Sequence, residues 1–319
     1  MTTSGTYAFT VNRDQIIRQS MLNIGKLDPD ENPTNSEISD CSLVLNMMVK
    51  QWMGKGDFAP GLKVWTRRRG HLFLRSTTGQ YAVGPTGTGW TETYVAPTTT
   101  VAAAAGAATL TLSSVTGVAN GYYIGFELST GDMQWTKVSG APAGNVVTLA
   151  AVTTASVLSG AQVFCYQTTA QQPIVVETAT LRDNQNNDVP LKLLTVQDYD
   201  LLPSKTAPTN VSDPSAIYYE YQLGNSNLFT DIAGAQDVTK HIVLTYMEAT
   251  QDFNAATDTP EYPQEYYLAL VWGLSKLIVP MFRAVWTPQM ETVYQLSVAI
   301  AQKKDPERVT LFYQPGAEE

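Results

Sequence analysis

The sequence is poor in the residues that usually carry metal and redox chemistry. It has only two cysteines and two histidines in 319 residues. Cys41 and Cys165 lie in segments of different character, so we expect free thiols in a reducing compartment rather than a disulfide framework. Neither His71 nor His241 lies at ligand spacing from a cysteine or from the other histidine, which argues against a zinc site. We therefore expect no metal and no cofactor.

Catalytic and targeting motifs are also missing. The phosphate-binding pattern G-x-x-x-x-G-K-[ST] does not occur, so we expect no ATP-driven packaging activity. The pattern G-x-S-x-G, which holds the nucleophilic serine of many hydrolases, is absent too. The N-terminus has no basic region followed by an apolar stretch, which indicates that there is no secretory signal.

No apolar run in the sequence is long enough to cross a bilayer. The best candidate, residues 266–282, is slightly short of the roughly 20 apolar residues that a membrane helix needs. Lys276 lies inside this run and Pro280 interrupts its end. The pattern predicts a buried core helix and no contact with a membrane.

Charge is scarce and mostly negative. Only 15% of the residues are charged, 44% are hydrophobic, and the formal net charge is −9. Such a chain can bury a large core and has room for two domains. The negative balance argues against wrapping nucleic acid, because that affinity comes mainly from neutralising phosphates. It is compatible with a passage through which DNA slides without sticking.

What the sequence does contain begins with two capped helices. Asn12 with Gln15 matches the capping-box pattern and starts a helix that Gly25 ends. Thr34 with Glu37 starts a second helix in the same way. The apolar stripe of this second helix comprises Ile38, Cys41, Leu45, Met48, Val49 and Trp52.

The stretch 261–304 predicts two further helices that meet at a proline-marked corner. Pro263 suits a first helical turn, and Pro280 should kink or end the helix that follows. Residues at steps of three and four give that helix an apolar stripe, which comprises Tyr267, Leu270, Val271, Leu274, Leu277, Ile278 and Met281. The second helix starts at Thr287-Pro288 and has a thinner stripe of Met290, Val293, Leu296 and Ile300.

Strand-like runs fill the middle of the chain. Residues 85–170 are rich in Thr, Ala, Gly, Val and Ser, with short alternating runs and turn signals that indicate an inserted all-β sandwich or barrel-like domain. Residues 1–84 and 171–304 would form the two parts of one helical domain, and residues 305–319 an extended arm. We therefore predict an α+β fold, with a helical core built from the N- and C-terminal helices, an associated small β-sheet and the β insert.

The order of these elements resembles a known family. The chain begins with a helix that contains NIG and a second helix that ends in KQWM, followed by the runs VWTRRRG and GQYAVG. Later come the segments PSAIYYEYQ, HIVLTYME and PEYPQEYYLALVWGLSKLIVP. This succession resembles the head-to-tail adaptor, or tail accessory factor, family of short-tailed and related phages. The insert VAAAAGAATLTLSSVTGVANGYYIGFELSTGDMQWTKVSG resembles the β-domain that some members carry.

The resemblance implies a structural virion protein of the phage neck and not an enzyme. Members form a homo-oligomeric ring, commonly a dodecamer, below the portal protein, extend the DNA channel and receive the tail nozzle or tail fibre proteins. Genomic DNA would pass without sequence-specific binding, and the protein would be made in the bacterial host cytoplasm. The C-terminal arm would dock on the portal through Val309, Leu311, Phe312 and Tyr313.

Two clusters could contact nucleic acid. Arg67, Arg68 and Arg69 form the only dense positive cluster, which could contact DNA phosphates, an acidic portal surface or the carboxylates of a neighbouring subunit. Successive side chains of a strand point to opposite faces, so the three cannot form one flat patch. Alternating tyrosines at positions 218, 219 and 221 could stack bases, but without interleaved cations they are ordinary sheet residues.

Two other functions stay open. A virion-associated peptidoglycan hydrolase needs two carboxyl groups about 5 to 10 Å apart, and Asp28, Asp30 and Glu31 could supply them, although acids in such a loop are usually solvated. A carbohydrate- or surface-binding module could use an aromatic platform on the insert, comprising Trp90, Tyr94, Tyr122, Tyr123 and Trp135.

Overall fold

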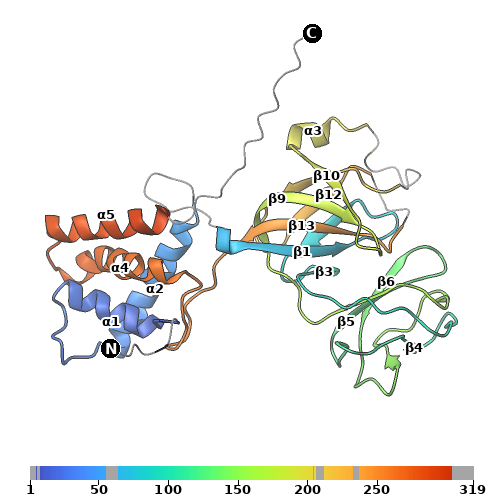
Figure 1. Ribbon diagram of the computed structural model, residues 1–319, viewed down its shortest axis with the longest axis horizontal. Helices are drawn as coiled ribbons and strands as arrows, with labels where there is room; N and C mark the ends of the chain where they lie inside the picture. The colour runs from blue at the N-terminus through green and yellow to red at the C-terminus, as the bar shows by residue number, and fades with distance from the viewer. Residues whose placement is uncertain are drawn as a thin grey trace, which may run out of the picture. The chain divides into compact units, whose positions relative to one another are not determined.

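The computed structural model describes Gly5 and residues 8–54, 64–203, 205, 212–232 and 237–303. The chain divides into two compact units (Figure 1). One comprises Met1–Thr66 together with Ala249–Glu319 and is called the helical unit here. The other comprises Arg67–Glu248 and is called the sheet unit.

The helical unit contains α1 (Arg13–Asn23), α2 (Asn35–Trp52), α4 (Tyr267–Phe282) and α5 (Pro288–Lys303), with a short 3-10 turn, η2 (Gln264–Tyr266), before α4. A second 3-10 turn, η1 (Val64–Thr66), closes its N-terminal segment. Both predicted capping boxes are confirmed, because the Asn12 and Thr34 side chains accept from the N–H of Gln15 and Glu37. Among the described residues no helix has the length and apolar character needed to cross a membrane.

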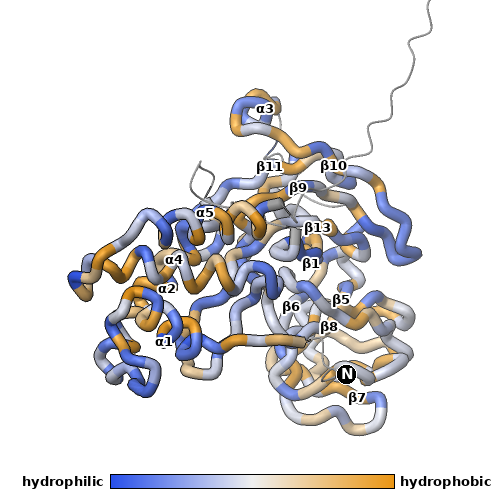
Figure 2. The backbone as a smooth tube through the Cα atoms, turned by 60° about the vertical axis from the view of Figure 1, so that its left-hand side comes forward, coloured by the Kyte–Doolittle hydropathy of each residue, from blue (hydrophilic) through white to orange (hydrophobic). Residues whose placement is uncertain are grey.

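The apolar helix α4 is the centre of the helical unit. It packs against α1, α2 and α5 and is hydrophobic along most of its length (Figure 2). α2 comes so close at Gly273 that an added Cβ would lie 2.8 Å from Met48 Sδ and 3.0 Å from Trp52 Cζ2. Towards α1, Ser20 Oγ donates to the Val271 carbonyl at 3.0 Å and Ser275 Oγ donates to the Ser20 carbonyl at 3.2 Å. The contact therefore leaves these buried hydroxyls satisfied.

An eight-stranded, nearly closed sheet forms the body of the sheet unit. Its strands, in spatial order, are β2 (Gln80–Val83), β12 (Ser226–Thr230), β11 (Ala216–Glu220), β10 (Asp188–Leu194), β9 (Pro173–Arg182), β13 (His241–Glu248), β1 (Arg67–Phe73) and β3 (Trp90–Thr91). Neighbours are antiparallel except β10 and β11. The turn of helix α3 (Val196–Asp200) follows β10.

Residues between β3 and β9 form two smaller sheets with their own core. One contains β6 (Met133–Lys137), β5 (Tyr123–Glu127) and β8 (Val163–Tyr166), and the other contains β4 (Thr109–Thr111) and β7 (Val146–Thr148). Ile124, Phe126, Val147, Val157 and Val163 are fully buried between them. That residues 85–170 fold by themselves stays a prediction.

The predicted fold class is wrong in its balance between helix and sheet. Helix accounts for only about 25% of the chain, and the dominant element is the eight-stranded sheet rather than a helical core with a small sheet attached. The physical reason lies in long-range pairing: Arg67–Phe73 pairs with His241–Glu248, from Arg67↔Met247 to Phe73↔His241. Short alternating runs show that strands exist but not which distant strand they join.

Candidate interaction surfaces

The outward face of α5 is apolar and carries no charge over residues 288–302, whose side chains the structure describes. Val293, Leu296 and Ile300 are 39%, 59% and 48% exposed and follow each other at steps of three and four residues, so they line one side of the helix. We call them the α5 stripe. The exposed side chains beside it are polar but uncharged, and they include Gln289, Thr292 and Gln295.

The one carboxylate of α5 is turned towards its own unit. Lys276 Nζ lies 2.9 Å from Glu291 Oε2, and Trp286 Nε1 donates to the same oxygen at 2.8 Å. These contacts lower the pKa of Glu291, with the hydrogen bond from Lys276 as the largest cause. Glu291, the one charged residue of α5 within residues 288–302, therefore already has partners in its own unit.

A second exposed apolar pair lies on α2. Leu43 and Met47 are 62% and 56% exposed and stand one turn apart; we call them the α2 stripe. Lys50, one turn further, is bound to its own unit through the Thr250 carbonyl at 2.6 Å and Asp252 at 2.7 Å. The inward face of α2 carries the predicted stripe. Ile38 is half-buried, and the other five members are buried, namely Cys41, Leu45, Met48, Val49 and Trp52.

The C-terminal end of α4 is less covered than the sequence predicts. Five residues of its predicted stripe are buried, namely Tyr267, Leu270, Val271, Leu274 and Ile278. Leu277 and Met281, by contrast, stay exposed, as does Val285 in the turn that follows. The prediction that Leu277 and Met281 join the core is therefore wrong. Arg283 ends the helix in the left-handed conformation at φ 52°.

The three arginines do not form one patch. Along β1, Arg68 shares its face with Gly70 and Leu72 inside the large sheet, whereas Arg67 and Arg69 point to the other face. Arg67 Nε lies 2.6 Å from Glu177 Oε2 and Arg68 Nε lies 2.8 Å from Glu248 Oε1. Arg69 is exposed. Two of the three cations are thus engaged within their own unit.

The acidic loop shows no catalytic geometry. Asp28, Asp30 and Glu31 are exposed, and Glu31 Oε2 accepts from the Asp28 N–H at 3.3 Å. Arg18 fastens the loop by donating to the Pro29 and Glu31 carbonyls. A glycosidase needs a general acid whose pKa is raised by an apolar pocket. Where the pKa of a carboxyl group departs from its ordinary value in the described residues, it is lowered, as for Glu37, Asp183, Asp188, Asp258 and Glu291.

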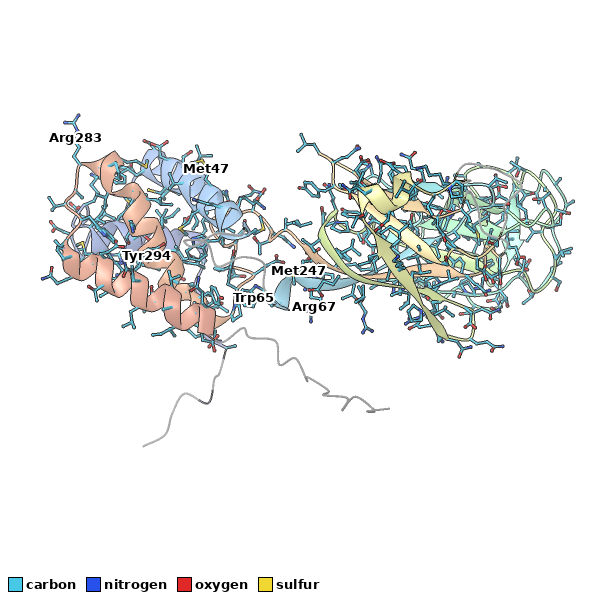
Figure 3. All side chains as sticks on the ribbon, turned by 90° about the horizontal axis from the view of Figure 1, so that it is seen from above. Met47, Trp65, Arg67, Met247, Arg283 and Tyr294 are labelled. Carbon is cyan, nitrogen blue, oxygen red and sulfur yellow. The ribbon has the colours of Figure 1, made fainter. Side chains whose placement is uncertain are left out.

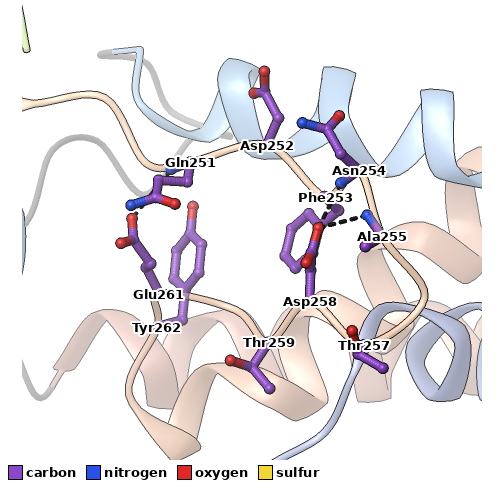
Figure 4. Close-up of a pocket in the computed structure, with 10 residues that line it drawn as sticks. All are labelled: Gln251, Asp252, Phe253, Asn254, Ala255, Thr257, Asp258, Thr259, Glu261 and Tyr262. Carbon is purple, nitrogen blue, oxygen red and sulfur yellow. Dashed lines mark hydrogen bonds between the residues drawn. The ribbon is translucent and has the colours of Figure 1, made fainter.

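A cavity of about 590 Å³ in the helical unit is formed by the loop at 251–262 (Figure 4). Asp258 accepts from the backbone N–H groups of Asn254 and Ala255 at 2.7 and 2.6 Å, and these bonds lower its pKa. Glu261 accepts from the Gln251 N–H at 3.1 Å. The carboxylates around this cavity therefore hold the loop in shape.

The aromatic residues proposed as a sugar platform do not lie together. Tyr122 is half-buried against the core of the insert, whereas Tyr94, Tyr123 and Trp135 are half-buried in another cluster. Trp90 is fully buried: a Cβ on Gly70 would lie 2.0 Å from its Cη2, and its Nε1 donates to the Gln171 carbonyl at 3.1 Å. Tyr94 and Trp135 pack on Phe73 with ring centroids 5.2 and 5.3 Å away. Aromatic residues of the insert thus cover the outer face of the large sheet.

The tyrosines near β11 also point in different directions. Tyr218 stacks on Phe229, its cross-strand partner, and on Tyr199 of α3. Tyr219 points into the large sheet, where its hydroxyl donates to the Pro173 carbonyl. Tyr221 is exposed. They do not form a row on which successive bases could stack.

The two histidines, far apart in sequence, are neighbours. Their ring centroids lie 5.2 Å apart beside Tyr94, whose hydroxyl is 3.3 Å from His241 Nε2. Burial first, then nearby cations, lowers the pKa of His71 to about 4, and burial followed by the neighbouring His71 lowers the pKa of His241 to about 3. No group of three or more metal-ligating side chains occurs in the described part of the chain.

Both cysteines are free, as the sequence predicts, and the structure shows both to be buried. Burial raises the pKa of Cys41 to about 11 and of Cys165 to about 12. Neither thiol is therefore a ready nucleophile at neutral pH.

Comparison with known proteins adds nothing to these surfaces. No family model and no curated protein matches this chain. The arm residues Val309, Leu311, Phe312 and Tyr313 lie outside the described residues.

Proposed function

We propose that the protein is a structural assembly protein whose copies associate into a ring, and that it serves as a head-to-tail adaptor in a phage neck. In this role it binds below the portal, extends the DNA channel and docks tail components. The resemblance of the ordered sequence motifs supports the adaptor role, and the surface of the helical unit supports self-association.

The observation that carries the proposal is the uncharged, apolar outward face of α5. Surface helices normally turn charged residues to solvent. The interior of a protein interface, in contrast, is depleted of charge and enriched in apolar side chains. α5 has the second pattern, although it lies at the surface of its own unit.

The charge of the chain fits a passage for DNA. With a formal net charge of −9 the protein gains little from phosphate neutralisation. Two of the three clustered arginines form ion pairs with carboxylates of the same unit. A channel wall of this kind would let genomic DNA slide.

The test is the mass of the purified chain, alone and with the portal protein of the same phage, by sedimentation velocity and negative-stain electron microscopy. We expect closed rings, formed either alone or on the portal. A monomer under both conditions would overturn the proposal.

A further inference from the structure

The two histidines lie where the insert rests on the large sheet. His71 belongs to β1 and His241 to the neighbouring strand β13. The two strands pair from Arg67↔Met247, both labelled in Figure 3, to Phe73↔His241. Side chains two residues apart on a strand, or directly opposite across an antiparallel pair, share a face. Both histidines therefore accompany Phe73 on the outer face of the sheet.

Aromatic side chains of the insert cover this pair. Tyr94 packs edge to face on both imidazoles, with ring centroids 4.8 Å from His71 and 5.3 Å from His241. Phe164 of β8 lies 6.0 Å from His241. We call this contact, formed by Tyr94 and Phe164 of the insert with the two histidines of the sheet, the insert joint.

The insert is connected to the large sheet by two neighbouring segments, one after β3 and one before β9. The Ala170 N–H donates to the Trp90 carbonyl at 3.2 Å, and Thr91 Oγ1 donates to the Thr168 carbonyl at 2.8 Å. The insert also has a hydrophobic core of its own between its two small sheets. It can therefore turn away from the large sheet about these connections without losing its own core.

The closed joint has no place for a second proton on either ring. Nδ1 of His71 and Nδ1 of His241 are buried without a hydrogen-bond partner among the described residues. His241 Nε2 faces the Tyr94 hydroxyl at 3.3 Å. A neutral imidazole can leave its acceptor nitrogen unmatched, whereas an imidazolium donates from both nitrogens. Protonation would therefore leave a buried N–H without an acceptor on each ring.

The charged groups around the joint oppose protonation as well. Arg69 of β1 and Arg182 of β9 lie near the pair, and Arg182 is the direct cross-strand partner of His241. Asp188 of β10 favours the charged imidazoles, but its two oxygens already accept from Arg182, each at 2.7 Å. Two added protons would thus collect four positive charges around one carboxylate that has a partner.

The other titratable neighbours of the joint are also engaged. Lys240, which precedes His241, lies 2.6 Å from Asp213 and 3.7 Å from Asp237. The Tyr166 hydroxyl of β8 accepts from the Gly89 N–H at 2.8 Å.

We propose that the insert joint is a pH-operated hinge, in which protonation of His71 and His241 releases the insert from the outer face of the large sheet while both parts keep their folds. The inference goes beyond the assembly role and does not depend on it. In the released state the two rings meet water, which solvates every N–H of an imidazolium.

Proton linkage sets the size of the effect. In the released state each histidine binds its proton near the ordinary pKa of 6.5, but in the closed joint the pKa is about 4 for His71 and about 3 for His241. Between pH 7.5 and pH 5 each histidine should raise the equilibrium constant for release by up to about 30-fold, and the two together by roughly three orders of magnitude.

Hydrogen exchange of two amides that bond across the contact measures release in the full chain. The Ser76 N–H donates to Asp132 Oδ1 of the insert at 2.9 Å, and the Gly89 N–H donates to the Tyr166 hydroxyl. After correction for the intrinsic rate at each pH, both amides should lose protection by the factor given above between pH 7.5 and pH 5. This range lies above the ordinary pKa of Asp and Glu, near 4.

Urea distinguishes release of the insert from unfolding of the whole sheet unit. Release exposes little surface, so exchange at Ser76 and Gly89 should depend only weakly on urea. Amides shared by β9 and β13 should exchange through a larger opening with a steeper urea dependence.

Three variants assign the effect to the histidines. In His71→Gln with His241→Asn, protection of the two amides should no longer change with pH. His71→Gln alone, at a half-buried position, should retain a change of about 30-fold and keeps the test available if the double variant does not fold. The matched control Tyr94→Phe keeps the ring and both histidines and should retain the full pH response.

Two results would overturn the hinge. If Ser76 and Gly89 exchange with the same opening constant and urea dependence as the β9–β13 pair, the insert does not release by itself. If the double variant keeps the pH response of the unmodified chain, groups other than the histidines drive the release.

Discussion

The helical unit and the sheet unit treat their apolar residues differently. In the sheet unit even large aromatic residues of the insert, such as Trp135 and Tyr94, are turned onto the outer face of the main sheet. In the helical unit Leu43, Met47, Leu296 and Ile300 remain at the surface around a well-packed α4. The sheet unit also exposes large apolar side chains, among them Leu201 at 82% and Leu223 at 98%, so the difference is that those of the helical unit follow one another along helix faces.

The largest expected effect comes from emptying the centre of the helical unit. Leu274 of α4 is fully buried, and Leu274→Ala should cost about 2–5 kcal/mol of folding free energy. If the two units are separate folding bodies, hydrogen exchange should accelerate in α1, α2 and α4 and stay unchanged in β1 and β13. Equal acceleration in both units would contradict the division.

The sheet unit should lose stability in acid through its histidine pair, the half-buried His71 and the buried His241. In the unfolded chain both histidines bind protons near their ordinary pKa of 6.5, but in the folded chain only near pH 4 for His71 and 3 for His241. The two histidines therefore contribute their full share of the folding free energy above pH 6.5, and this share is lost as pH falls towards 4. Because one pKa unit corresponds to about 1.4 kcal/mol, the lowered pKa of His71 alone should account for a loss of about 3 kcal/mol in folding free energy.

Denaturant unfolding between pH 7 and pH 4, followed by exchange in β1 and β13, measures this loss. The other charged groups near the pair, Arg69, Arg182 and Asp188, also act on it, so a matched variant is needed. His71→Gln with His241→Asn should flatten the profile over this range. An equally steep profile in the double variant would show that other groups cause the loss.

One substitution made in both units sharpens the comparison. Gly70→Ala in β1 would place a Cβ 2.0 Å from Trp90 Cη2, inside a rigid indole ring. We expect a loss of about 1–3 kcal/mol in thermal or denaturant unfolding. Gly273→Ala in α4 meets Met48 Sδ at 2.8 Å, and this flexible side chain can move, so its cost should be smaller. The reverse order would contradict the packing described at these two glycines.

The smallest effect is expected at a helix cap. Thr34→Ala removes the side chain that accepts from the Glu37 N–H and should destabilise the helical unit by about 1 kcal/mol. Thr34→Ser keeps the acceptor and should be nearly neutral. Urea unfolding of the three proteins distinguishes the cap from a mere change of size.

Sequence alone predicted what depends on neighbours along the chain. The capping boxes at Asn12 and Thr34 and the restart of helix at Pro288 are confirmed. Each depends on a pattern of a few residues, which is visible without the fold.

Long-range pairing could not be predicted in this way. Nothing near Arg67 indicates that β1 pairs with β13, or near Trp90 that this indole fills the space above Gly70. The size of the main sheet was underestimated for this reason. Likewise the periodicity of α4 marks an apolar face but not how far neighbouring helices cover it, so the exposure of Leu277 and Met281 was missed.

The central claim is that exposed apolar residues of the helical unit join copies of the chain. Native mass measurement of the unmodified protein and of the Leu296→Glu variant tests this claim most directly. The account predicts a closed multiple of 34.8 kDa for the unmodified chain, alone or on the portal, and a single 34.8 kDa species for the variant under the same conditions. Equal masses for the two proteins would contradict it.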